Sequence, residues 1–492
     1  MTSAILLSAT LLLAGADTVR PQPVMIEYPA LEQTVKQAMK AEADSVPVVP
    51  GAPTAAPAET KSIVLSRQQC IDIALQDNPT IKVADMEIRR MDLSKLETRA
   101  ALFPSVDFSG AYQRSLALQT ISMNMGGQTQ SIKMGSDNTW NFGFSATVPL
   151  FAPTLWKSLK ISDTQILASY ETARASRLNL VDQVNQAYYA LMLAKASYEV
   201  LEANYELAKY NADIYSKQFS FGTATEYDVL RSQVAVTNLE PELLEAQIAI
   251  DRCRLQLRVL MGIADDIVID PDVTLKDMER DMYDYVARID RSLSGNTDLR
   301  SLDIQAEMAD RTVELRKWAF LPTLGASLNI NWNALSNGNA LKNQQFHPYS
   351  VLGFQLSIPL FQGGSRYYGL KQAEVQSKEI RLQRENLVNA LNMQVDLAVE
   401  NINKEVRQIS SSAEGVRQAE KARSIMQKSF EIGAGSFLSL RDSEVAEVTA
   451  KLTYYQAIYN YLISTSALDL LLGREEELRN IGYSFPINQP KK

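Results

Sequence analysis

The segment between Leu180 and Phe219 contains neither glycine nor proline, and its apolar residues recur at alternating steps of four and three. This 3.5-residue period is typical of a left-handed supercoiled helix. The apolar seam comprises Leu180, Val184, Ala187, Leu191, Ala194, Tyr198, Leu201, Tyr205, Ala208, Ala212, Tyr215 and Phe219. A continuous helix from Pro153 to Phe219 would be roughly 100 Å long, and no compact domain can enclose a helix of that length.

A second apolar seam follows the same segment, through Leu193, Ala196, Val200, Ala203, Leu207, Tyr210 and Ile214. At about 103° per residue, the two seams lie on nearly opposite sides of the helix. We therefore expect a helical neighbour on each side, so that the helices form a wall.

Of the two remaining faces, one is charged (Glu199, Glu202, Glu206, Lys209 and Asp213, with Lys195) and the other is polar but uncharged (Ser197, Asn204, Asn211 and Gln218). A wall that is wet on both faces indicates a tube with an outside and an inside. The alternative is a long helical bundle with one frayed face.

The composition argues against several classes of function. The 492 residues carry a formal net charge of −8, whereas a nucleic-acid-binding face would be basic. His347 is the only histidine, which excludes most metal sites and most histidine-dependent catalysis. The sequence shows no phosphate-binding glycine loop, zinc-protease motif or nucleophile elbow. We expect no enzyme activity, no cofactor and no metal, and we expect Cys70 and Cys253 to be packed thiols.

The N-terminal residues 1–16 form the one continuous apolar run and end in small residues, as a secretory signal peptide does. A buried N-terminal helix is the alternative. Residues 17–62, rich in proline and alanine, are expected to be a leader or linker. No other segment reaches the roughly 18 apolar residues of a membrane helix. If the mature protein crosses a membrane, the sequence predicts that it does so by strands.

Two segments alternate in the manner of β-strand pairs, at 103–151 and 322–361. In the first, one side carries Val106, Phe108, Tyr112, Trp140, Phe142, Phe144, Ala146 and Val148, and small polar residues occupy the other. The second has Leu324, Ala326, Leu328, Ile330, Trp332, Leu352, Phe354, Leu356 and Ile358 on its apolar side. Each strand is expected to have about ten residues, the length of a tilted membrane strand. A loop through Gly126 and Gly127 is expected to connect the first pair, and a soluble sandwich remains an alternative.

The sequence order repeats, which predicts a tandem duplication. Repeat 1, residues 63–262, comprises a short helix, a second helix, the strand pair 103–151, a long helix 153–219 and a return helix 225–261. Repeat 2, residues 296–473, comprises a helix, the strand pair 322–361, a long helix 364–431 and a return helix 436–472. Residues 263–295 connect the repeats, with an extended piece at 267–269 and a helix near 275–289, and residues 474–492 form a tail.

Four strands from one chain cannot close a barrel, because membrane barrels begin at eight strands. Since open strand edges cannot face lipid, a membrane-inserted sheet of this kind requires several copies of the chain. Two copies would supply eight strands and three would supply twelve.

The doubled order of motifs resembles that of the TolC family of outer-membrane efflux proteins, over about residues 63–475. The matching segments are 65–79, 102–104, 148–151 and 219–228, with their second-repeat counterparts up to Gly473. The resemblance implies a mixed α and β membrane protein: a homotrimer with a 12-stranded outer-membrane β-barrel that continues as a long periplasmic α-helical barrel. It also implies an equatorial region formed by the connection 263–295 and the short helix near Leu65.

The resemblance further implies a function as an exit duct for small molecules or proteins, with a periplasmic adaptor and an inner-membrane transporter as partners. Family members carry acidic gate residues near the helical hairpins; the corresponding positions are Asp228, Ser439 and Asp442, so that one of the acidic positions holds serine here. Gly222, Thr223, Gly433 and Gly435 correspond to hairpin tips where an adaptor docks. Asp228 is equally interpretable as a helix cap, and Asp442 as a solvated residue beside Arg441.

The aromatic residues Trp140, Phe142, Phe144, Trp332, Tyr349 and Phe354 are expected to face outer-membrane lipid. A non-conducting coiled-coil scaffold or surface stalk is the competing hypothesis. It explains the long helices but explains neither the membrane-length strands nor the duplication.

Overall fold

The computed structural model describes residues 62–125, 128–263, 267–281, 291–338, 344–432 and 434–474. The predicted signal peptide 1–16, nearly all of the predicted leader 17–62, Gly433 and residues 475–492 lie outside these ranges. All of the elements below belong to one compact unit of the chain, Lys61–Lys492.

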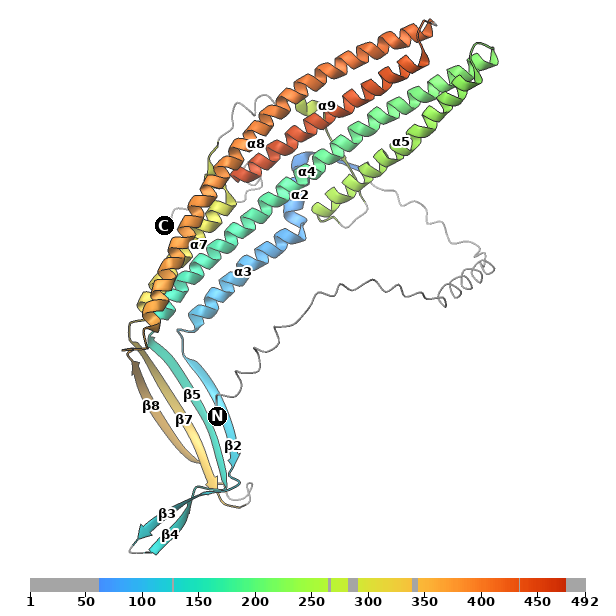
Figure 1. Ribbon diagram of the computed structural model, residues 1–492. Coiled ribbons are helices and arrows are strands. Elements are labelled where there is room, and N and C mark those ends of the chain that lie inside the picture. Colours follow the sequence, from blue (N-terminus) through green and yellow to red (C-terminus); the bar gives the residue numbers. More distant parts are fainter. Residues whose placement is uncertain are drawn as a thin grey trace, which may run out of the picture. The chain divides into compact units, whose positions relative to one another are not determined.

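The helices of this unit form a wall in two tiers (Figure 1). In the tier next to the strands, α4 lies between α3 and α7, and α7 contacts α8. In the distal tier, α4 lies between α5 and α9, and α9 contacts α8. The bounds are α3 Pro79–Ala100, α4 Pro153–Ser220, α5 Glu226–Leu260, α7 Thr297–Trp318, α8 Ser365–Glu431 and α9 Phe437–Leu472.

The helix α4 runs unbroken for 68 residues, as the gap-free seam predicts. It has helical neighbours on both sides, as the two opposed seams also predict. The prediction of a wet, uncharged polar face is wrong. Asn204 and Asn211 are only 7% and 3% exposed, because this face packs toward α9, where Asn211 Nδ2 donates a hydrogen bond to Glu444 at 2.9 Å. The charged face remains exposed.

The duplication is visible in two equivalent junctions. Asn78 caps the start of α3 and donates from Nδ2 to the carbonyl of Leu260 at the end of α5, at 2.8 Å. Asn296 caps the start of α7 and makes the same 2.8 Å bond to Leu471 at the end of α9. One side chain thus satisfies the last carbonyls of one helix while it starts the next.

The remaining short elements pack around this junction. The helix α2, Arg67–Asp77, begins with a Ser66 capping box, and β1, Ser62–Leu65, pairs in parallel with β6, Val268–Pro271. β6 includes two residues of the extended piece predicted at 267–269. Where a helix near 275–289 was predicted, the structure has the 3₁₀ turn η1, Asp277–Asp281, and residues 282–290 lie outside the described ranges. A further 3₁₀ turn, η2, spans Leu293–Gly295.

The hydrophobic core is centred where these short elements meet α4, α5, α8 and α9. Its fully buried members include Ile71, Tyr188, Leu191, Leu257 and Ile269. Cys70 and Cys253 lie in this core as free, buried thiols, as predicted. Among the described residues, no helix combines the length and the apolar character needed to cross a membrane.

The main sheet has four antiparallel strands in the order β2-β5-β7-β8. Their bounds are β2 Ser105–Arg114, β5 Asn138–Phe151, β7 Thr323–Ser336 and β8 His347–Ser357. The prediction of a plain loop between the first two strands is wrong, because this connection contains a second hairpin, β3 Gln119–Met125 with β4 Gln128–Met134. The edge strands β2 and β8 each pair with one neighbour only in the described part of the chain.

Candidate functional site

The sheet has two chemically different faces, which its register defines. Phe144 pairs with Phe108 on one side and with Ile330 on the other. Phe142 likewise pairs with Trp332. Since directly paired residues point to the same face, these side chains form one continuous apolar surface. Five of the six predicted aromatic residues share it, namely Trp140, Phe142, Phe144, Trp332 and Phe354.

Tyr349 does not share this face, and its predicted place beside the other aromatic residues is wrong. It pairs with Asn331, which in turn pairs with Gly143, and both of these belong to the polar side of the sheet. The physical reason is the two-residue period of a strand. Phe354 and Tyr349 are separated by an odd number of residues, so their side chains point to opposite faces.

The polar face is almost free of charge. It carries mainly serine, threonine, asparagine, glutamine and glycine, as in Ser145, Thr147, Asn329 and Gln355, together with Tyr349, Val351 and Leu335. Asp107 is the one Asp, Glu, Lys or Arg that the register places on this face of the described strands. A surface that can hydrogen-bond water without fixed charge suits the wall of an aqueous passage.

At the other end of the wall, two helical hairpins form the tips. Gly222 ends the α4 hairpin with a positive φ of 73°, as the residue after a helix often does. Thr223 closes the turn by donating its backbone N–H to the carbonyl of Gln218 at 2.9 Å. In the second tip, the backbone N–H of Gly435 donates to the carbonyl of Ser429 at 2.9 Å. The fourth predicted tip residue, Gly433, lies outside the described residues.

Asp228 and Ser439 occupy equivalent positions, the third residue of α5 and of α9. The Asp228 carboxylate accepts hydrogen bonds from Thr225 Oγ1 at 2.6 Å and from the backbone N–H of Thr225 at 3.2 Å. These bonds hold the pKa of Asp228 below its usual value. Ser439 donates its backbone N–H to the cap residue Ser436. Asp228 therefore completes the capping box whose N-cap residue is Thr225. Asp442 is exposed, one turn further along α9.

An aromatic contact joins the two hairpins near their tips. The ring of Tyr215 on α4 lies 5.6 Å from that of Phe430 on α8 and 5.1 Å from that of Phe437 on α9. The guanidinium of Arg231 on α5 lies 5.4 Å from the Phe437 ring. Tyr215 is buried, and burial is the largest cause of its raised pKa. Tyr215 belongs to the first apolar seam of α4, and Phe430 to a weaker heptad seam of the second long helix, with Val395, Ile402, Ile409 and Val416. The sequence therefore predicts helix contacts for both residues but not which helices they join.

The sequence does not predict a cluster of charges behind the tips, in which Glu447 is buried and its partners are partly exposed. Arg423 of α8 pairs with Glu447 of α9, and Lys451 pairs with Glu447 at 2.7 Å and with Glu420 at 3.1 Å. The cluster borders a cavity of about 590 Å³ between α4, α8 and α9. One feature of the sequence indicates this charge cluster. Arg423 occupies a seam position, seven residues after Val416 and seven before Phe430, where an apolar residue is expected.

A wall of long helices, an amphipathic four-stranded sheet and two equivalent repeats together define the architecture of this chain. The sequence profile of the family described as "Outer membrane efflux protein" matches residues 70–263 and 288–474. The chain belongs to this family. The two matched ranges correspond to the two structural repeats.

Curated relatives and solved structures agree with this assignment. Alkaline protease secretion protein AprF of Pseudomonas aeruginosa is 26% identical over 427 residues, which cover 84% of this chain and 86% of the relative. Outer membrane protein TolC of Vibrio cholerae is 20% identical over 382 residues, or 77% and 84% of the two chains. The crystal structure of the Campylobacter jejuni CmeC outer membrane channel aligns with a TM-score of 0.64 at 16% identity, covering 89% of this chain and 96% of that one. This structural likeness concerns the fold alone.

The members of this family are outer-membrane channel proteins of efflux and secretion systems. None of the relatives named above is described as an enzyme. The family resemblance inferred from the sequence is thereby confirmed. The gate, tip and lipid-facing roles predicted for individual residues stay predictions.

Proposed function

We propose that three copies of this chain form an outer-membrane exit duct. In this proposal, three four-stranded sheets close a 12-stranded barrel in the outer membrane, and the helical walls close a periplasmic barrel below it. The polar sheet face lines the passage, and the apolar face contacts lipid. The observation that carries the proposal is the sheet with one mainly apolar and one mainly polar face, whose edges at β2 and β8 are unpaired in the described part of the chain. Such edges require partners in lipid.

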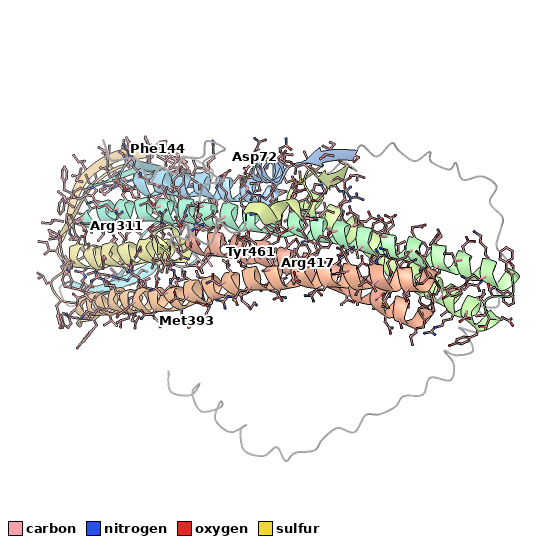
Figure 2. The ribbon with its side chains drawn as sticks, turned by 90° about the horizontal axis from the view of Figure 1, so that it is seen from above. Asp72, Phe144, Arg311, Met393, Arg417 and Tyr461 are labelled. Carbon is pink, nitrogen blue, oxygen red and sulfur yellow. The ribbon has the colours of Figure 1, made fainter. Side chains whose placement is uncertain are left out.

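Within the described residues, the helical wall also ends in unpaired surfaces at both lateral edges. On α5, exposed apolar residues keep heptad spacing, at Tyr227, Leu230, Val234, Leu244, Ile248 and Leu255. On α8, the exposed apolar residues include Val375, Leu382, Met393, Leu397 and Ile425. Figure 2 shows Met393 at the outer margin of α8. Seams of this kind on opposite edges suit head-to-tail packing of identical copies in a closed ring.

The partners in this proposal are a periplasmic adaptor and an inner-membrane transporter, which supplies the energy. The adaptor contacts the hairpin tips, near Gly222, Thr223, Gly433 and Gly435. Large apolar side chains beside these glycines support this placement, since Phe221 is 82% exposed and Ile432 is 80% exposed. Large exposed apolar residues at a hairpin tip are typical of a protein interface. The cargo is either small molecules, such as drugs and toxins, or proteins.

A non-conducting scaffold remains the second candidate, because it would use the same helices. The polar face of the sheet, nearly free of charge, favours the duct, since a scaffold has no need of a hydrated inner surface. Single-channel recording of the detergent-purified oligomer in a planar bilayer separates the two. A duct gives discrete conductance steps. An oligomer that inserts but never conducts, even with Asp228 and Asp442 both neutralised, would exclude the duct and favour the scaffold.

The carboxylates near the tips give a more specific prediction. If Asp442 forms a ring of three carboxylates in the gate, Asp442→Ala should increase the single-channel conductance, because it removes a charged constriction from the passage. It should also reduce cation selectivity, because the three carboxylates repel one another and attract cations. Ser439→Asp should increase cation selectivity by adding a second ring. Bi-ionic reversal potentials measure both effects.

The matched control is Asp213→Ala, which removes the same charge from the exposed face of α4, where Asp213 pairs with Lys217. This variant should change neither conductance nor selectivity. Equal effects of Asp213→Ala and Asp442→Ala would contradict a gate role for Asp442.

A further inference from the structure

The apolar face of the sheet continues onto the first turn of α4. Phe151, the last residue of β5, pairs with Leu324 on the apolar face. The ring of Trp156 meets the Phe151 ring edge-on, with centroids 5.2 Å apart, and Trp156 is 40% exposed. Trp156 therefore marks the side of the helical wall that continues the lipid-facing surface. Lys160 lies one turn further on and is exposed on the same side of α4.

Cations outnumber carboxylates around Trp156. Lys157 Nζ pairs with Glu314 Oε2 at 2.5 Å, and this bond is the main cause of the lowered pKa of Glu314, to which Lys160 and Arg311 also contribute. Three cations, Lys157, Lys160 and Arg311, thus lie among two carboxylates, Glu314 and Glu307. Figure 2 shows Arg311 on α7 beside α4, and its side chain also pairs with Glu307 at 2.6 Å.

The start of α8 repeats this arrangement. Lys371 Nζ pairs with Glu374 Oε2 at 2.9 Å. The hydrogen bond from Lys371 is the main cause of the lowered pKa of Glu374, and Lys317 and Lys378 lie close enough to add to it. Here three cations lie around one carboxylate, and the two nearest the sheet, Lys317 and Lys371, leave an excess of positive charge at the junction.

Aromatic rings are interleaved with these cations. Lys157 Nζ lies 4.5 Å from the ring centroid of Trp318, and Lys371 Nζ lies 5.9 Å from that of Tyr367. Tyr367 is 54% exposed. Tryptophan and tyrosine favour the boundary between hydrocarbon and water, and lysine side chains reach toward headgroups there.

We propose that this strand-to-helix junction binds anionic phospholipid headgroups, with Lys160, Lys317 and Lys371 contacting their phosphates. The proposal rests on membrane insertion of the sheet, as in the proposed function. Lys160 and Lys371 lie about 10 Å along their helices from the strand end, and Lys317 is next to the last residue of α7. All three lie within about one Debye length of the headgroup layer, whereas Lys378 lies roughly 20 Å away.

Tryptophan fluorescence quenching tests this proposal. Trp140, Trp318 and Trp332 are replaced by phenylalanine, which leaves Trp156 as the only tryptophan. The oligomer is reconstituted in mixed phosphatidylcholine and phosphatidylglycerol vesicles, with bromine on one or the other lipid. We expect phosphatidylglycerol to be bound around Trp156 at least five-fold more tightly than phosphatidylcholine. A factor of about five is the effect of one lysine near a charged membrane surface.

The triple substitution Lys160→Gln, Lys317→Gln, Lys371→Gln should abolish this preference. Lys378→Gln, which removes the same charge beyond the reach of the headgroups, should leave it intact. An equal loss in both variants, or no preference in the parent protein, would overturn the proposal. If the tryptophan substitutions prevent folding, the ratio of phosphatidylglycerol to phosphatidylethanolamine that co-purifies with the otherwise unmodified protein gives the same comparison.

Failure of the lipid proposal can be distinguished from failure of the duct. In a Trp156→Phe, Trp318→Phe variant, which keeps only Trp140 and Trp332, quenching by lipids brominated in the acyl chains reports insertion of the sheet, whatever the headgroup. Insertion without a headgroup preference overturns the lipid site and leaves the duct. Absence of insertion overturns both.

Discussion

Gly473→Ala is expected to destabilise the protein by about 4 kcal/mol. Gly473 ends α9 with a φ of 64°, a conformation in which an L side chain is strained. A Cβ at this position would also lie 1.9 Å from the carbonyl oxygen of Gly295. Neither group can move freely, because the adjacent Asn296 bonds Leu471 across the same junction. The variant should therefore lose the close packing between α9 and the start of α7.

Two other glycines provide matched controls. Gly262, the equivalent residue of repeat 1, has a φ of 69°, and its Cβ would lie 2.8 Å from the carbonyl oxygen of Asp77. Gly222 has a φ of 73° but nothing within 4 Å of a Cβ, so Gly222→Ala carries only the backbone cost of about 1 kcal/mol. The temperature at which helical circular dichroism is lost should decrease least in Gly222→Ala, more in Gly262→Ala and most in Gly473→Ala. Equal effects of Gly222→Ala and Gly473→Ala would contradict this account of the junction.

Glu447→Ala is expected to loosen the packing of α8 against α9. Glu447 is 7% exposed and pairs with both Arg423 and Lys451. Removing it leaves two cations near a low-dielectric helix interface without their shared carboxylate. Loss of one partner from a buried pair costs about 3–5 kcal/mol, and the partial exposure of Arg423 and Lys451 reduces our expectation to about 2 kcal/mol.

Hydrogen exchange measures this loosening directly. A local cost of about 2 kcal/mol corresponds to roughly 30-fold faster exchange of amides in the 416–455 region. Arg423→Ala combined with Glu447→Ala should exchange more slowly than Glu447→Ala alone, because the double variant leaves one fewer unpaired charge. Glu420→Ala is the control, since its side chain is 49% exposed. If the double variant exchanged fastest, the charge-pair explanation would be wrong.

The elements predicted well are those that local sequence determines. The heptad seam defines α4 because a period of 3.5 residues over many turns has no other low-energy solution. The caps at Ser66 and Thr225 mark helix starts because their side chains bond the first free N–H groups. Alternation defines the four strands of the main sheet, and the duplication allows each repeat to support the interpretation of the other.

The failures concern contacts between elements. The polar stripe through Asn204 and Asn211 is amphipathic in the sequence, and only the position of α9 makes it buried. Tyr349 was assigned to the apolar face from its residue type, whereas the register decides its direction. The partner of Arg423 comes from α9, in a register that no local pattern specifies. Even so, an arginine within an apolar seam indicates that a charge pair lies at this helix interface.

The central claim is that the polar face of the sheet lines a conducting passage, and cysteine modification during single-channel recording tests it most directly. Asn331→Cys places a thiol on the polar face, and Ile330→Cys places one on the apolar face of the same strand. The native thiols of Cys70 and Cys253 are buried. A positively charged methanethiosulfonate should reduce the conductance of Asn331→Cys in three discrete steps, one for each subunit of the proposed trimer. It should leave Ile330→Cys unchanged. Block of Ile330→Cys with no effect on Asn331→Cys would contradict the account.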